Sequence, residues 1–163
     1  MAEQRQTSAE TVLTRIGQAA MLLHGGDREE ARNRFGELWA EIGESGKAFD
    51  RCTLAHYMAD TQDDPGDELA WDLRALTAVE GQDTGAGECS SAARAFLPSL
   101  HLNLAADYLE LQRPEAARLH LDRARDAADA LGAAGYGNGI RTGIDRLERR
   151  LASGAWGSAE RGE

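Results

Sequence analysis

Apolar residues recur at i, i+4, i+7 and i+11 in seven consecutive stretches of this 163-residue chain. This spacing places them on one face of an α-helix, whereas a half-buried strand alternates apolar and polar residues. Composition agrees, because 48 residues are alanine or leucine and only six are isoleucine or valine, the aliphatic residues that strands favour. The sequence therefore predicts an all-α protein.

Residues that favour helix ends divide the chain into helical pairs. Asp and Thr side chains accept hydrogen bonds from free N–H groups at helix starts, proline suits the first turn, and glycine follows helix ends. We predict one domain over residues 1–152 and a disordered tail over 153–163. The domain comprises helical pairs at about 8–43, 50–80 and 97–131 and a last helix at 139–152. The expected helix starts are Thr7, Asp27, Asp50, Asp64-Pro65, Pro98 and Pro114.

Two details concern the insides of these helices. Pro98 either begins the fifth helix, which we expect, or lies inside a helix that begins near Ser91. The buried face of the fourth helix is expected to hold Leu69, Leu73, Leu76 and Val79.

Charge and cysteine content narrow the class of protein. The net charge of −10 repels phosphate backbones and anionic lipids, so nucleic acids and membranes are disfavoured as partners. Residues 1–10 are polar and no apolar run is long enough to cross a membrane, which predicts a cytoplasmic protein. Cys52 and Cys89 are expected to be free thiols. The single lysine beside seventeen arginines, with abundant alanine and glycine, suggests a high-GC bacterium.

One stretch matches the spacing of a known helical repeat. Leu104-Ala105-Ala106-Asp107-Tyr108, followed by Pro114-Glu115-Ala116-Ala117, resembles the L-G-x-x-Y and A-x-x-x-F spacing of the tetratricopeptide (TPR) family. Matching residue pairs begin at Ala31, Ala70 and Ala117, although their separations of 39 and 47 residues exceed the usual 34 or so of that family. The resemblance implies a right-handed superhelix of three antiparallel helix pairs, closed by a C-terminal capping helix.

This resemblance also implies a binding surface. In TPR proteins the first helices of the pairs line a concave groove that receives a peptide or a helix of a partner. The groove residues that follow by alignment are Leu13, Ile16, Ala20, Leu23, Cys52, Ala55, His56, Ala59, Asp63, Ser99, Leu102, Asn103, Ala106 and Glu110.

Asn103 falls where some TPR domains hold an asparagine that binds the ligand backbone. The basic residues that complete such a clamp are absent, so a basic or amphipathic partner is favoured over a free carboxylate. The alternative for Asn103 is a solvated side chain or a hydrogen bond between helices.

No motif points to catalysis or to a cofactor. The chain lacks a P-loop, a dinucleotide fingerprint, a nucleophile elbow and a zincin motif, so we expect no enzyme. Cys52 and His56 have a metal-compatible i, i+4 spacing, but nothing paired supplies two further ligands. The acidic stretch from Asp60 to Glu68 lacks the ligand pattern of an EF-hand. We expect neither metal nor cofactor.

The expected function is therefore a non-catalytic protein-interaction module, an adaptor or scaffold. Two alternatives remain open: a regulatory sensor that binds a small molecule or signal peptide, and a self-associating structural protein. In the last case Trp156 in the Gly-rich tail could anchor a homodimer or dock on the groove.

Overall fold

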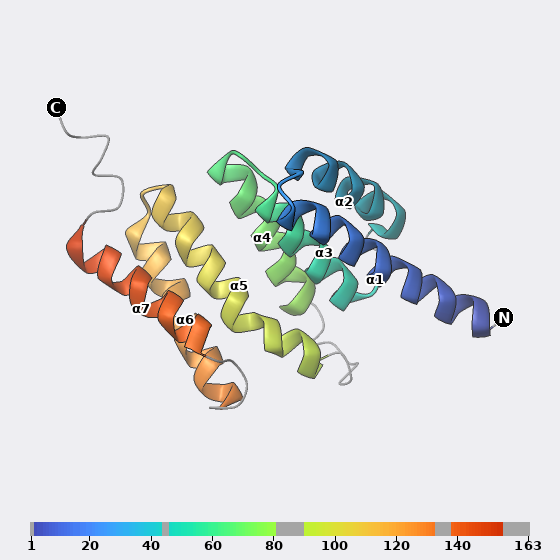
Figure 1. The fold of residues 1–163 in the computed structure, drawn as a ribbon. Helices are drawn as coiled ribbons and strands as arrows, with labels where there is room; N and C mark the ends of the chain where they lie inside the picture. The colour runs from blue at the N-terminus through green and yellow to red at the C-terminus, as the bar shows by residue number, and fades with distance from the viewer. Residues whose placement is uncertain (1, 44–45, 81–89, 133–137, 155–163) are drawn as a thin grey trace.

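The computed structural model describes residues 2–43, 46–80, 90–132 and 138–154, which are mostly helical and contain no strand (Figure 1). The prediction of an all-α protein is confirmed. None of the helices in these ranges combines the length and the apolar character that crossing a membrane requires. The helices are α1 (Ala2–His24), α2 (Arg28–Ile42), α3 (Ala48–Asp60), α4 (Pro65–Glu80), α5 (Ser90–Glu110), α6 (Pro114–Leu131) and α7 (Asn138–Ser153).

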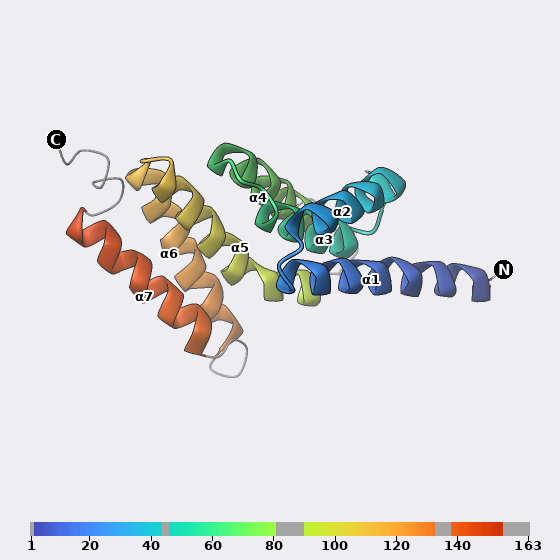
Figure 2. The same cartoon turned by 45° about the horizontal axis from the view of Figure 1, so that its top comes forward.

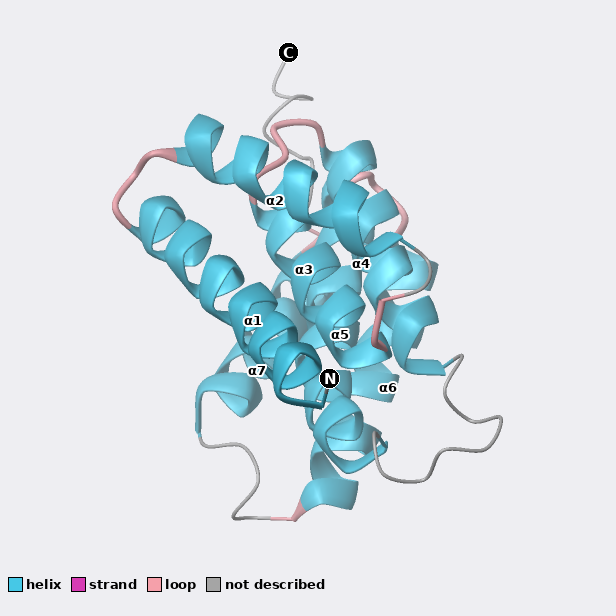
Figure 3. Cartoon of the chain, turned by 90° about the vertical axis from the view of Figure 1, so that its right-hand side faces the viewer, coloured by secondary structure: helices cyan, strands magenta, loops and turns pink. Residues whose placement is uncertain are grey.

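Each helix packs against the next one in the chain. In addition, α1 contacts α3, α3 contacts α5 and α5 contacts α7, so the odd-numbered helices follow one another through the molecule. Figures 1 and 2 show this progression from α1 and α2 at one end to α6 and α7 at the other. In Figure 3, α1 and α2 face the viewer in front of α3.

Several helix boundaries follow from local chemistry, as predicted. Asp27 caps α2 by accepting a hydrogen bond from the backbone N–H of Glu30 at 3.3 Å. Asp64 accepts one from the N–H of Asp67 at 3.1 Å, directly before Pro65 begins α4. Pro114 begins α6, and Gly132 ends it with a φ of 78° that favours glycine. These signals act within a few residues and need no tertiary contact.

Three predicted starts are wrong. Helix α1 begins before Thr7, at Ala2, and α3 begins at Ala48, so that Asp50 lies buried in its first turn instead of capping it. Helix α5 begins at Ser90 and contains Pro98, which is almost completely buried. A proline inside a helix removes a hydrogen bond, and here its burial in the core offsets that loss.

The core consists of three clusters along the stack. Phe35 and Leu54 belong to the cluster of α1, α2 and α3, Leu100 belongs to that of α3, α4 and α5, and Leu121 and Ile144 belong to that of α5, α6 and α7. Many of the other core residues are alanines, whose small side chains let the helices approach closely.

Helix α4 buries a face different from the predicted one. Leu76 and Val79 are buried as predicted, but Leu73 is 36% exposed and Asp72 is only 1% exposed. On this buried face, Trp71 packs against Trp39 of α2, with ring centroids 5.1 Å apart in an edge-to-face arrangement. Arg74 lies over the Trp71 ring at 4.3 Å, a cation–π contact that explains an arginine where the repeat pattern has a bulky apolar residue.

Candidate functional site

The structure brings three carboxylates together between α4 and α5. Glu68 and Asp72 lie one turn apart on α4, so their side chains share one face of that helix, and Asp107 comes from α5. One carboxylate oxygen of each residue lies within 4.8 Å of the others. We call Glu68, Asp72 and Asp107 the acid cluster.

Burial sets the protonation of the acid cluster. Asp72 and Asp107 are 1% and 2% exposed, and Glu68 is half-buried. Desolvation raises the pKa of Asp107 to about 9, and a hydrogen bond with Asp72 raises it further in the same direction. Desolvation also raises the pKa of Asp72 and that of Glu68, each to about 7. At neutral pH and without a cation, Asp107 is therefore protonated, and Glu68 and Asp72 are each about half protonated.

Two oxygens of the acid cluster are unsatisfied. Among the described residues, Oδ1 of Asp72 and Oδ2 of Asp107 have no hydrogen-bond partner although both atoms are buried. Buried polar atoms without a partner are rare in folded proteins, since each costs free energy. The arrangement can hold protons or a cation.

A second buried polar group lies on α5, against α6. Nδ1 of His101 and Nδ1 of His120 are 3.0 Å apart, so one ring donates a hydrogen bond to the other. Tyr108 stacks on His120 with ring centroids 5.4 Å apart. Desolvation lowers the pKa of His101 to about 4 and also lowers that of His120, and the positive charge of Arg123 acts in the same direction on both. We call His101 and His120 the histidine pair.

A hydrogen bond joins α3 to α5 at the predicted groove residues His56 and Asn103. The Asn103 amide donates to Nδ1 of His56 at 3.2 Å. Burial lowers the pKa of His56, against the opposing effect of the Asp60 carboxylate. The structure thus gives Asn103 the inter-helix hydrogen bond that the sequence left as an alternative.

Five predicted groove residues lie in the core instead of on a groove surface. Their side chains pack between helices, so they cannot contact a partner in this structure, and the assignment is wrong for them. They are Ile16, Ala20, Cys52, Ala55 and Ala59. Cys52 is fully buried, and burial raises the pKa of its thiol to about 12.

Leu102 is half-buried and is covered by α7. A Cβ placed on Gly143 would lie 2.7 Å from Cδ2 of Leu102, so the glycine is what lets the two helices approach. Leu102 therefore belongs to the packing of α5 against α7, and it does not line an open groove.

The remaining predicted groove residues are at least partly accessible. Leu13, Asp63 and Glu110 are exposed, whereas Leu23, Ser99 and Ala106 are half-buried. Asp63, however, is already engaged within the chain: its carboxylate forms ion pairs with Arg28 at 3.1 Å and Arg32 at 3.4 Å. Cys89 and Trp156 lie outside the described residues.

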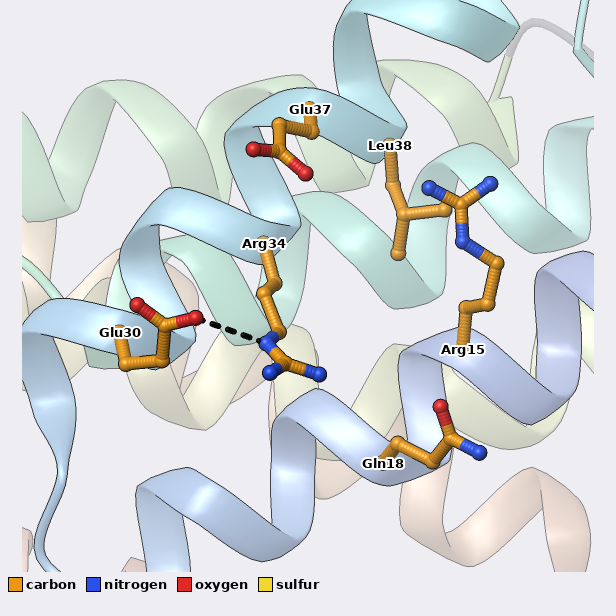
Figure 4. A pocket seen from close by; sticks show the side chains of 6 residues that line it. All are labelled: Arg15, Gln18, Glu30, Arg34, Glu37 and Leu38. Atoms are coloured by element: carbon orange, nitrogen blue, oxygen red, sulfur yellow. Dashed lines mark hydrogen bonds and ion pairs between the residues drawn. The ribbon is translucent and has the colours of Figure 1, made fainter.

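A hollow of about 230 Å³ lies between α1 and α2 (Figure 4). Its charged groups are largely paired within the chain: Arg34 binds Glu30 at 2.9 Å, and Arg15 binds Glu41 with both terminal nitrogens. Since these charges are compensated, the hollow lacks the unsatisfied groups seen in the acid cluster. It is lined by Arg15, Gln18, Glu30, Arg34, Glu37 and Leu38.

Sequence reasoning missed the acid cluster and the histidine pair. The i, i+4 spacing of Glu68 and Asp72 was a usable signal, because it places two carboxylates on one helix face. Nothing local connects Asp72 to Asp107 or His101 to His120, since the members of each pair lie on different helices, 35 and 19 positions apart in the chain. Comparisons with protein-family models, with curated proteins and with solved structures found no match to this chain.

Proposed function

We propose that this protein is a non-catalytic interaction module, a TPR-like stack of helix pairs that binds a basic or amphipathic segment of a partner protein. The sequence of helix contacts supports this reading. Consecutive helices pack as pairs, and α1, α3, α5 and α7 contact one another in order, as the first helices of stacked repeats do.

The observation that carries the proposal is a set of exposed carboxylates that form no ion pair among the described residues. Residues 52–73 contain six carboxylates and no lysine or arginine. Asp60, Asp67 and Glu110 are exposed, and Asp60 and Glu110 both interact electrostatically with Glu68, so α3, α4 and α5 contribute to one region. We call Asp60, Asp67 and Glu110 the acidic end.

A surface of one charge sign attracts partners of the opposite sign and speeds their encounter. Among the described residues, Arg28 and Arg32 form ion pairs with Asp63. Arg28 also lowers the pKa of Asp60 electrostatically, but no ion pair of the described residues reaches Asp60, Asp67 or Glu110. These three carboxylates thus remain available for the lysine or arginine side chains of a partner.

The test is affinity capture from the host lysate with a variant that neutralises the acidic end. Asp60→Asn, Asp67→Asn and Glu110→Gln are combined, and Asp64 is left intact because it caps α4. The matched control neutralises the exposed α6 residues Asp122, Asp126 and Asp129 to asparagine, which changes the net charge equally. Ile16 and Leu102 are not substituted, since both pack inside the protein.

We expect a partner that the wild type and the α6 control retain and that the acidic-end variant loses. Titration calorimetry with the identified segment should then show weaker binding as salt increases, because exposed charges are screened. Equal capture by all three proteins would contradict the assignment of the surface. An empty capture with a dimeric mass in light scattering would favour self-association instead.

A further inference from the structure

We propose that the acid cluster of Glu68, Asp72 and Asp107 is a binding site for one divalent cation that prefers oxygen ligands, namely Mg²⁺, Mn²⁺ or Ca²⁺. This inference is independent of the proposed interaction function. It concerns the buried contact between α4 and α5, whereas partner binding is assigned to exposed carboxylates.

The oxygens of the three carboxylates are close enough together to coordinate one ion. One oxygen from each of the three residues lies within 4.8 Å of the other two. Oxygen ligands lie about 2.0–2.6 Å from these cations, so two oxygens on opposite sides of one ion are about 4–5 Å apart, and adjacent ones are closer. A single ion between α4 and α5 can therefore contact all three carboxylates.

The unpartnered atoms provide the second, independent reason. Oδ1 of Asp72 and Oδ2 of Asp107 lack a hydrogen-bond partner among the described residues, and the two side chains are 1% and 2% exposed. A buried polar atom without a partner is costly, whereas a metal ion satisfies carboxylate oxygens directly. Two of the three carboxylates thus each retain a buried acceptor atom that an ion could satisfy.

The electrostatic surroundings favour a cation. Besides the cluster itself, the ionisable groups that interact with these three carboxylates are Asp60 and Glu110, both acidic, and the thiol of Cys52, whose pKa of about 12 keeps it neutral. No arginine or lysine of the described residues compensates the cluster, unlike Asp63, which binds Arg28 and Arg32. A set of three carboxylates suits hard cations such as Mg²⁺, Mn²⁺ and Ca²⁺, which prefer oxygen ligands.

The three carboxylates differ in exposure. Glu68 is half-buried, whereas Asp72 and Asp107 are buried. An ion can therefore enter past Glu68 and keep water in the coordination positions that the three carboxylates do not fill, as Mg²⁺ commonly does.

The experiment uses the full chain, stripped with EDTA and dialysed into metal-free buffer. Mn²⁺ is titrated and the free ion is followed by electron paramagnetic resonance, which counts bound ions directly. Thermal unfolding is then measured with each of the three cations. The test variants are Asp107→Asn and Glu68→Gln, and Asp126→Asn, an exposed α6 carboxylate, is the control with the same change in net charge.

We expect one Mn²⁺ bound per wild-type chain with a Kd below about 1 mM, together with a higher melting temperature in at least one cation. Asp107→Asn and Glu68→Gln should each weaken binding about tenfold or more, while Asp126→Asn should bind like the wild type. Circular dichroism confirms that each variant is folded. Since Glu68 is only half-buried, Glu68→Gln keeps the test informative even if Asp107→Asn unfolds.

Two results would overturn the proposal. One is a wild-type chain that binds no Mn²⁺ and whose melting temperature does not respond to any of the three cations. The other is equal weakening by Glu68→Gln and Asp126→Asn, which would show diffuse attraction to an acidic protein. Neither result bears on partner capture by the acidic end, so the two proposals fail separately.

Discussion

Helix α5 buries ionisable groups on two sides, and the two sides differ in how far those groups are satisfied. Against α6, His101 and His120 hydrogen-bond to each other at 3.0 Å, and Tyr108 stacks on His120. Against α4, Asp107 joins Asp72 in the acid cluster, where each of the two retains one buried oxygen without a partner. The two histidines thus hydrogen-bond to each other, whereas the acid cluster retains buried oxygens without a hydrogen-bond partner.

The two groups also respond to burial in opposite directions. Desolvation disfavours the charged form, so it raises the pKa of the carboxylic acids and lowers that of the imidazoles. Near pH 7 in the metal-free protein, the histidine pair and Asp107 are consequently neutral, whereas Glu68 and Asp72, each with a pKa of about 7, are only partly ionised. The comparison shows that a tightly packed α-helical stack retains ionisable side chains in its core by suppressing their charges.

The largest expected effect comes from Asp107→Asn in EDTA. The folded-state pKa of Asp107, about 9, lies above its unfolded value, so the folded chain holds a proton that the unfolded chain lacks. Stability from this group is therefore present at low pH and is lost as pH rises towards 9. An asparagine needs no proton, and we expect Asp107→Asn to raise the free energy of unfolding at pH 8 by about 2 kcal/mol.

Urea unfolding at pH 5 and pH 8, with Asp126→Asn as the control, measures this effect. The gain should shrink at pH 5, because protonating the carboxyl on folding costs less as the pH approaches its unfolded pKa of 3.8. A variant less stable than the wild type at pH 8 would show that residue 107 works as a bound, ionised carboxylate even without metal.

An intermediate effect is expected from the histidine pair. The folded-state pKa of His101, about 4, is lower than its unfolded value near 6.5, so its contribution is fully present above about pH 6.5 and is lost as pH falls towards 4. His120→Phe preserves a ring beside Tyr108 but removes one imidazole. We expect it to reduce the loss of stability between pH 6.5 and 4.5 by about 1 kcal/mol relative to the wild type.

Urea unfolding of the wild type and of His120→Phe, measured at half-unit pH intervals, tests the pH dependence assigned to the histidine pair. Because the acid cluster is common to both, its opposite pH dependence cancels in the difference. Parallel curves for the wild type and His120→Phe would refute the claim that the buried pair carries this pH dependence.

The smallest expected effect concerns the third polar contact of α5, between Asn103 and His56. Asn103→Ala removes one half-buried hydrogen bond of 3.2 Å and should cost about 1 kcal/mol. Asn33→Ala, on the exposed surface of α2, is the matched control for the change in helix propensity. The free energies of unfolding of Asn103→Ala and Asn33→Ala are compared by chemical unfolding at pH 7. Equal values would show that the Asn103 hydrogen bond does not stabilise the fold.

Local signals in the sequence were sufficient for the helix class and for several boundaries. Asp27, Asp64 with Pro65, Pro114 and Gly132 lie where predicted, because capping and proline chemistry act within one helical turn. The same reasoning failed at Asp50 and Pro98. There tertiary burial outweighs local preference, and both side chains lie inside the protein.

The candidate site was much less predictable. The resemblance to TPR repeats selected residues by register, but Ile16, Cys52 and Ala59 are core residues in the structure, and Leu102 packs under Gly143. A shift of one residue in the buried face of α4 was enough to expose Leu73 and bury Asp72. Helical periodicity indicates that a helix has a buried face. Successive residues are about 100° apart around the helix, so an error of one residue selects a different face.

The sequence by itself determined that this chain is helical, where several of its helices begin and end, and that it is acidic, because periodicity, capping and charge are local or additive properties. Only the tertiary structure decided which carboxylates and which histidines meet. Asp107 reaches Asp72 and His101 reaches His120 only after α4, α5 and α6 have packed, and the chemistry of both clusters arises from that burial.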